Sequence, residues 1–276
     1  RLDAELAAGS SPADLLLTSD PAHFARLKQE GRLLARATLG SLRIPRALSD
    51  PDGAWVSSRL GIMVLAFRSD EKSPPTRMSD LWSAPLKGES IVGDPLSSGT
   101  FFTSLAVLEL VHGPGFFPSL REANVLATGG NSTVQEKILS REKRAGLLLL
   151  ENVLAAKANG EPLEFRIPDD GVIVVPGPVA ILAGAPHPAA AAAVEDWLLG
   201  EHAQRIIAQV GRMHSPRDGI APPDGAPPLD GLMKPVHFAI YPEILVKVCA
   251  FAPMRNVSAA IRAAQAHRNS LYDAGA

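Results

Sequence analysis

Small polar residues separate two apolar runs where the sequence reads Ser98-Gly99-Thr100. A strand-like run, Ser90–Gly93, precedes them, and a run with helical spacing follows. The three residues therefore fall where a helix begins, and the first N–H groups of a helix have no partner inside it. Those N–H groups, the two hydroxyls and the positive end of the helix dipole favour the binding of an anion.

Helix capping is the competing interpretation of the same turn. The hydroxyl of Ser98 or Thr100 can accept a hydrogen bond from a backbone N–H of the first helical turn. Serine and threonine are common at this position for that reason alone. Taken by itself, the turn favours capping over a ligand site.

A second turn of this kind follows the predicted strand 124–127. Ser132 and Thr133 come after two glycines there and before another predicted helix. Ser132 with Gln135, and Thr133 with Glu136, both fit a capping box. Two helix N-termini that converge on one cleft would hold an oxyanion from two sides.

Two further residues stand where a predicted strand gives way to a helix. Ser19 lies between an apolar strand at 14–18 and a helix at 23–30, and either it or Asp20 can cap that helix. Glu151 follows the apolar run 146–150, at the carboxyl end of a strand, where open α/β sheets bind ligands. As an alternative, Glu151 only stabilises the helix N-terminus through the dipole.

The elements that must position these residues alternate between strands and helices. Residues 62–67 are apolar in succession, as expected for a strand covered on both faces. Two short strands are predicted at 172–175 and 179–182, separated by Pro-Gly-Pro, and a last strand and helix at 243–251 and 257–267. This alternation predicts an α/β fold with a mixed sheet flanked by helices.

Composition excludes several functions. The 276 residues carry a formal net charge of −2 without a dense basic run, which argues against nucleic acid as a partner. The seven histidines show no metal-site spacing, Cys249 is the only cysteine, and phosphate-loop and nucleophile-elbow motifs are absent from the sequence. We therefore predict no enzyme activity, no metal site and no cofactor. No apolar run is long enough to span a membrane.

The order of these motifs resembles type 2 periplasmic solute-binding proteins of ABC importers. The likeness is greatest to the branch that carries ferric iron, phosphonates or sugar phosphates. The segments that carry the resemblance are 13–21, 93–100, 146–157, 168–171, 178–188, 193–199 and 211–213. Together they cover roughly residues 1 to 230.

The resemblance implies two α/β lobes joined by a two-strand hinge, with strands near 62–67 and 172–175 leading across it. Lobe 1 would comprise residues 1–67 and 177–276, and lobe 2 residues 68–176. Such proteins close around a solute and deliver it to the ABC transporter permease. We accordingly expect a monomeric periplasmic or other extracytoplasmic protein whose partners are a small anionic ligand and that permease.

The resemblance also assigns the ligand contacts. They fall on Ser19, Ser98, Gly99, Thr100, Ser132, Thr133 and, less directly, Glu151. Because the two turns that favour an anion are among them, the ligand interpretation now outweighs capping there. Ferric members carry a tandem tyrosine near Leu150-Glu151, which this chain lacks, so we expect a small oxyanion, a phosphonate or phosphate ester. Ferric iron or a carboxylate in the same family, and an enzyme or sensor domain on this fold, are the alternatives.

The chain ends differ from the family pattern. Family members open with a strand, a ligand-binding loop and a helix, which are not found before Arg1, and no signal-peptide pattern is present. Residues 246–251 followed by 252–256 resemble that opening unit. Two hypotheses follow: the chain is truncated or processed at its start, or its tail fills the first-strand position as in a circular permutation. Arg68 is a further candidate for an oxyanion contact, although a surface role is favoured.

Overall fold

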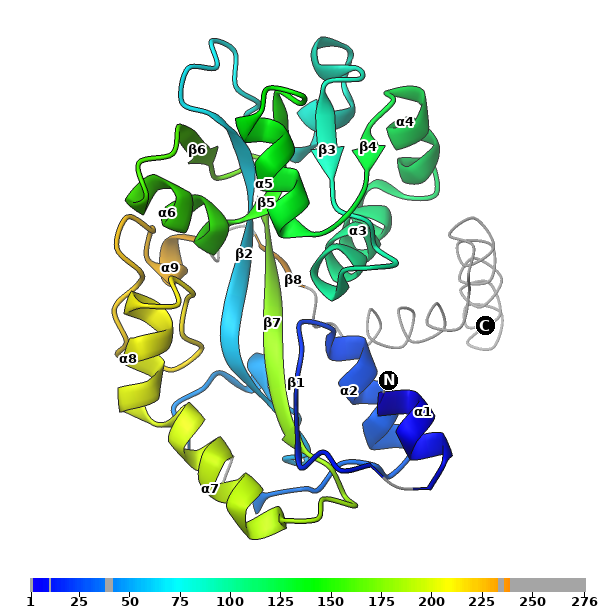
Figure 1. Ribbon diagram of the computed structural model, residues 1–276, viewed down its shortest axis with the longest axis vertical. Helices are drawn as coiled ribbons and strands as arrows, with labels where there is room; N and C mark the ends of the chain where they lie inside the picture. The colour runs from blue at the N-terminus through cyan, green and yellow to red at the C-terminus, as the bar shows by residue number, and fades with distance from the viewer. Residues whose placement is uncertain (1, 10, 38–41, 233–235, 239–276) are drawn as a thin grey trace, which may run out of the picture.

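The computed structural model describes residues 2–9, 11–37, 42–232 and 236–238. These residues form a mixed eight-stranded sheet flanked by helices (Figure 1). The strands are β1 (Leu15–Leu17), β2 (Val56–Arg68), β3 (Ser90–Val92), β4 (Leu126–Ala127), β5 (Ala145–Leu149), β6 (Leu163–Arg166), β7 (Val172–Ile181) and β8 (Val236–Phe238). The α-helices are α1 (Leu2–Ala7), α2 (Pro21–Gln29), α3 (Gly99–His112), α4 (Phe116–Glu122), α5 (Asn131–Leu139), α6 (Leu150–Ala158), α7 (Pro188–Leu199), α8 (Glu201–Gln209) and α9 (Leu229–Leu232). Short 3-10 helices span Arg46–Leu48, Met78–Trp82 and Ala84–Leu86.

Two long antiparallel strands, β2 and β7, run through the whole molecule (Figure 1). They pair from Val56 opposite Val179 to Met63 opposite Ile173. Every residue of β7 is buried, and so are most residues of β2, which fits their apolar sequences and the expectation of a strand covered on both faces. The two strands therefore connect the upper and lower halves of the molecule.

The break predicted at Pro176-Gly177-Pro178 is wrong, because β7 continues through it. The partner strand explains this. The register of β2 shifts between Ser57 and Arg59, opposite this segment, as in a β-bulge. Prolines, which lack an N–H, are tolerated at such irregular positions of a sheet.

The upper half holds β3, β4, β5 and β6 with helices α3 to α6 (Figure 1). Strands β5, β3 and β4 are parallel, and β5 and β6 both pair antiparallel with the last part of β2. One large apolar cluster fills this half, with Phe101, Phe116 and Leu148 fully buried. This arrangement follows the alternation of strands and helices in the sequence.

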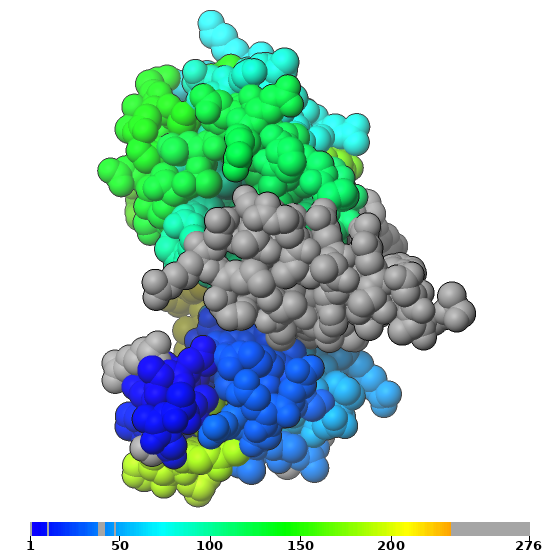
Figure 2. Space-filling model, turned by 90° about the vertical axis from the view of Figure 1, so that its right-hand side faces the viewer, coloured from blue at the N-terminus to red at the C-terminus, as the bar shows by residue number. Residues whose placement is uncertain are grey.

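The lower half holds β1, α2, α7 and α8, and its core is smaller. β1 pairs antiparallel with the end of β7, and Phe24 of α2 packs with Trp55 and Ala180. In the side view, the cyan and green residues of the upper half and the blue residues of the lower half lie at opposite ends (Figure 2). Separate apolar clusters for the two halves fit a two-lobed fold, although the predicted lobe boundaries stay a prediction.

Several helix starts differ from the sequence-based expectation. α5 begins at Asn131 with Gly130 as its N-cap and no side-chain cap, so the capping boxes predicted for Ser132 and Thr133 are wrong. α6 begins at Leu150, which places Glu151 in its first turn rather than at the end of a strand. When a helix follows a strand directly, with no polar residue between them, no capping residue in the sequence marks where the helix begins.

The predicted strand at 243–251, the helix at 257–267 and the permutation hypothesis lie outside the described residues. Within the described ranges, none of the helices has both the length and the apolar character needed to cross a membrane.

Candidate functional site

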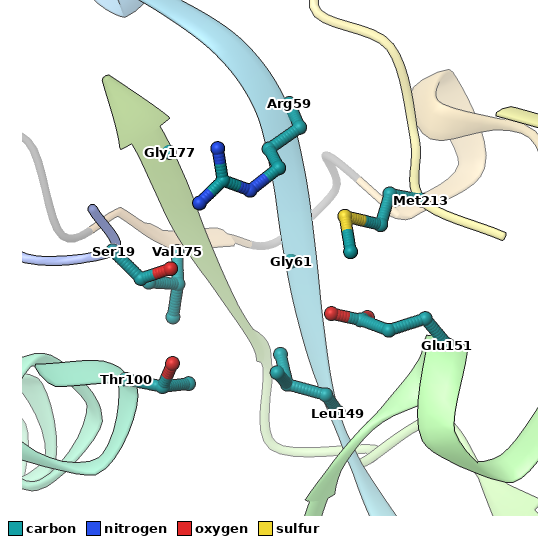
Figure 3. A pocket seen from close by; sticks show the side chains of 9 residues that line it. All are labelled: Ser19, Arg59, Gly61, Thr100, Leu149, Glu151, Val175, Gly177 and Met213. Carbon is teal, nitrogen blue, oxygen red and sulfur yellow. The ribbon is translucent and has the colours of Figure 1, made fainter. Parts of the chain in front are cut away.

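A pocket lies where the upper and lower halves meet β2 and β7 (Figure 3). Its empty space is about 220 Å³, open solvent at its mouth included. The lining residues are Ser19, Arg59, Gly61, Thr100, Leu149, Glu151, Val175, Gly177 and Met213. Ser19 comes from the loop before α2 in the lower half, while Thr100 and Glu151 come from α3 and α6 in the upper half. The pocket therefore joins elements that are far apart in the sequence.

Arg59 brings a positive charge into the pocket from β2. Its guanidinium lies against Gly177 of β7, where an added Cβ would come within 2.7 Å of the arginine Cγ and 2.9 Å of its Cζ. Only a glycine leaves room for the arginine in this position. Its hydrogen bond within the described part of the chain runs from Nη1 to Ser58 Oγ at 3.4 Å.

The electrostatics of Arg59 are set by burial. Burial lowers the pKa of the Arg59 guanidinium, and the charge of Glu151 opposes that change. Arginine nevertheless stays protonated at neutral pH. Among the described residues, no carboxylate forms an ion pair with it, so its charge is available to a ligand in the pocket.

Two hydroxyls face the same space, those of Ser19 and Thr100 (Figure 3). Thr100 is buried in the first turn of α3, and Ser19 precedes α2. The two helix starts touch: Thr103 Oγ1 donates to the Ser19 carbonyl at 3.4 Å, and a Cβ added to Gly99 would lie 3.3 Å from the Cβ of Asp20. This contact holds the two hydroxyls at one side of the pocket.

Glu151 lies on the other side of the pocket, beside Met213 (Figure 3). Its Oε1 is 3.9 Å from the place where a Cβ of Gly61 would stand. Burial raises the pKa of Glu151 from its usual 4.5 to about 7, against smaller opposing effects of a hydrogen bond from its own backbone N–H and of the Arg59 charge. Near neutral pH the carboxyl is thus divided between its protonated and ionised forms.

The remaining predicted residues, Ser98, Gly99, Ser132 and Thr133, do not line the pocket. Ser98 is the N-cap of α3 and accepts from the Phe101 N–H at 3.5 Å, so the capping interpretation describes its contact. Ser132 and Thr133 open α5, and Ser132 is exposed. Their loop is tied to the loop before α3, since the Asp94 N–H donates to the Gly129 carbonyl at 2.8 Å.

Sequence reasoning missed Arg59, Gly61, Gly177 and Met213. Arg59 had a usable signal, because it is a charged residue inside a run that is otherwise apolar or small. Met213 had no such signal in the sequence. A backbone contact places it in the pocket, because the Leu60 N–H donates at 2.8 Å to the carbonyl of His214, the residue that follows Met213.

Arg68, the arginine that was a sequence-based candidate for an oxyanion contact, has a structural role. It pairs with Asp70 and donates to the Leu139 carbonyl at 2.8 Å. Asp20, next to Ser19, caps α2 by accepting from the His23 N–H. No cluster of three or more histidine, cysteine or acidic residues suited to a metal ion is found among the described residues.

Comparison with known protein families matches residues 2–212 to the family of bacterial extracellular solute-binding proteins. The chain belongs to this family. The proteins of this family are extracellular and bind solutes without being enzymes. This confirms the protein class and the location that we expected from the sequence. An uncharacterized protein of Haemophilus influenzae is 31% identical over 170 residues, which cover 58% of this chain and 49% of that protein. The match thus spans about half of that relative's length.

Solved structures of this solute-binding class share the fold. The substrate-binding protein of an ABC transporter from Agrobacterium tumefaciens superposes with a TM-score of 0.76 at 14% identity, covering 98% of this chain and 83% of its own. Iron-bound HitA from Pseudomonas aeruginosa superposes with a TM-score of 0.75 at 21% identity, covering 92% of this chain and 82% of its own. AfuA from Actinobacillus pleuropneumoniae, with fructose-6-phosphate bound, superposes with a TM-score of 0.72 at 21% identity, covering 86% of this chain and 80% of its own. These likenesses confirm the predicted two-lobed α/β fold.

Proposed function

We propose that this solute-binding protein captures a small oxyanion, a phosphate ester or phosphonate, between its two halves and delivers it to the permease of an ABC importer. The observation that carries the proposal is Arg59, whose guanidinium faces the pocket without a carboxylate partner among the described residues. Ser19 and Thr100 add two hydroxyl donors beside it. A monomer acting outside the cytoplasm fits this role.

The chemistry of these groups matches that of an oxyanion. Guanidinium binds phosphoryl oxygens through charge-assisted hydrogen bonds, which are about twice as strong as neutral ones. The start of α3 adds backbone N–H groups and the positive end of its dipole next to Thr100. Because the residues that line the site are buried or half-buried, these interactions act at a lower effective dielectric constant than on a surface.

Ferric iron is the second candidate. Several proteins with similar folds are ferric-binding proteins by name or hold iron, and AfuA holds fructose-6-phosphate. Glu151 would be the carboxylate ligand in this pocket. The guanidinium of Arg59 opposes a trivalent cation there, and no described cluster supplies a full ligand set, so the residues favour the oxyanion.

A thermal-shift panel tests the proposal. Phosphate, sulfate, hexose phosphates, alkylphosphonates, small dicarboxylates and ferric citrate are added to the full chain, and a ligand that binds only the folded state raises the melting temperature. We expect the largest rise with a phosphorylated solute or a phosphonate. A rise with ferric citrate alone would replace the proposal by the ferric alternative.

Two double variants test which helix start contacts the anion. Ser19→Ala/Thr100→Ala removes the hydroxyls that line the pocket, and Ser132→Ala/Thr133→Ala makes the same changes at the start of α5. We expect the first pair to abolish most of the ligand-induced rise and the second to leave it nearly unchanged. The opposite order would place the anion at α5.

A further inference from the structure

The pocket carries two opposite charges that are not paired with each other. Arg59 and Glu151 both line it, yet no ion pair between them is found among the described residues. Their mutual influence is electrostatic only: each charge shifts the pKa of the other without a hydrogen bond. A structural salt bridge would have brought the two groups into contact, so each remains available for a separate group of a ligand.

The two charges face the pocket from different sides. Ser19 and Thr100 lie on one side with the Arg59 guanidinium above them, whereas the Glu151 carboxyl extends from the opposite side beside Met213 (Figure 3). Gly61 lies between them on β2, where an added Cβ would come within 2.8 Å of Leu149 Cδ2 and 3.9 Å of Glu151 Oε1. A ligand that contacts both sides must therefore carry two different groups.

Glu151 needs a partner that donates. Its carboxyl is half-buried and accepts a hydrogen bond from its own backbone N–H, but no described side chain hydrogen-bonds it. A half-buried carboxylate without a charged partner costs free energy, and a cation in contact with it recovers that cost. The nearby charged or titratable groups cannot fill this role: Arg59 is held against Gly177, Asp20 is acidic, and His214 is buried with its Nε2 2.8 Å from the Pro227 carbonyl.

We propose that the solute is a small zwitterion whose oxyanion binds Arg59, Ser19 and Thr100 and whose ammonium group binds Glu151. This inference rests on the proposed function and names its substrate class more closely. A neutral zwitterion leaves neither pocket charge unpaired, whereas a simple anion leaves Glu151 without a partner.

Three phosphonates of nearly equal size separate the ammonium contact from the oxyanion contact. They are 2-aminoethylphosphonate, 2-hydroxyethylphosphonate and propylphosphonate, measured by calorimetry on the full chain at pH 8, where Glu151 is mostly ionised. We expect the amine to bind at least tenfold more tightly than the other two. Equal affinity for all three would overturn the zwitterion and leave the oxyanion proposal intact.

Substitution of the carboxylate tests the assignment to Glu151. In Glu151→Gln the preference for the amine should fall to within about threefold, while affinity for propylphosphonate is kept or increased because a negative charge is lost. Glu151→Asp retains the charge one carbon further away and should keep part of the preference. The control is Glu136→Gln, an identical change at an exposed residue of α5, which should alter nothing.

The other outcomes are equally distinct. A preference for the amine that survives in Glu151→Gln would overturn the role of Glu151. Tightest binding of the hydroxyl compound would show that Glu151 accepts from a hydroxyl and would overturn the ammonium group. No binding of any phosphonate or phosphate, together with binding of ferric citrate, would contradict the proposed function itself, and the zwitterion with it.

Discussion

At the scale of single residues, the pocket depends on which side chains are missing as much as on which are present. Arg59 occupies its position because Gly177 has no Cβ, and Leu149 occupies its position because Gly61 has none. Both glycines lie in the two long strands, so the strands serve as the floor of the site.

Gly177→Ala should weaken anion binding without unfolding the protein. The new methyl group would stand 2.7 Å from the Arg59 Cγ, and the flexible arginine must move away from its place in the pocket. A charge-assisted hydrogen bond contributes about 1.5–3 kcal/mol, so we expect roughly a 10- to 100-fold loss of affinity by calorimetry. Gly184→Ala is the control, because nothing lies within 4 Å of its added Cβ. Unchanged affinity in Gly177→Ala would show that the position of Arg59 is irrelevant.

Glu151→Gln should change how the stability of the ligand-free protein depends on pH. The folded-state pKa of about 7 lies above the unfolded value of 4.5, so the favourable contribution of the protonated carboxyl is complete below pH 4.5 and is lost as the pH rises through 7. The full difference is on the order of 3 kcal/mol. Urea unfolding at pH 5 and pH 8 should therefore show a larger loss in the wild type than in the variant. Identical losses would contradict the raised pKa.

At the scale of elements, the sequence predicts where an individual helix begins better than it predicts which helix N-termini lie next to each other in the fold. The apolar run after Ser98-Gly99-Thr100 formed α3 as predicted, and Asp20 and Ser98 cap their helices. The start of α5 did not follow its capping-box pattern, because Gly130 supplies the N-cap without a side chain. Helix capping is a local interaction, so the sequence pattern that predicts it spans only about four residues.

The pocket itself depends on long-range register, which local patterns do not encode. Arg59 faces Gly177 only because a register shift lies between Ser57 and Arg59 in the pairing of β2 with β7. Three of the seven predicted ligand residues, Ser19, Thr100 and Glu151, nonetheless line the pocket. They come from the ends of different elements, so the resemblance to a known family was needed to group them.

Ser98→Ala tests the capping role of this residue separately from ligand binding. The Ser98 side chain accepts from the Phe101 N–H at 3.5 Å, a long hydrogen bond, so we expect a loss of stability of about 0.5–1 kcal/mol. Ser98→Asn retains a capping oxygen and should keep most of that stability. The difference is measured by urea unfolding without ligand. A large loss of anion binding with unchanged stability would instead place Ser98 among the ligand contacts.

At the scale of the whole molecule, the two halves touch at the starts of α2 and α3. The backbone of Ser19 accepts from Thr103, and Gly99 packs against Asp20. These contacts join one half to the other beside the pocket, which is the arrangement expected of a solute-binding protein closed over its ligand site. The contact at Gly99 has little room, since an added Cβ would lie 3.3 Å from Asp20.

Gly99→Leu should therefore hinder closure. We expect weaker anion binding and a smaller ligand-induced decrease in the radius of gyration, measured by small-angle scattering, while the ligand-free protein keeps its helical content. Gly115→Leu, at a glycine with nothing within 4 Å of its added Cβ, is the matched control. Full compaction of Gly99→Leu by the ligand would contradict a role for this contact in closure.

Arg59 is proposed to hold the oxyanion of the solute, and a pair of arginine variants on one strand tests this claim. Arg59→Gln and Arg68→Gln make the same change in β2, inside and outside the pocket respectively. Calorimetric titration with the anion that gives the largest thermal shift should show at least a tenfold loss of affinity for Arg59→Gln and an affinity near that of the wild type for Arg68→Gln. Equal affinities for the wild type and Arg59→Gln would contradict the claim.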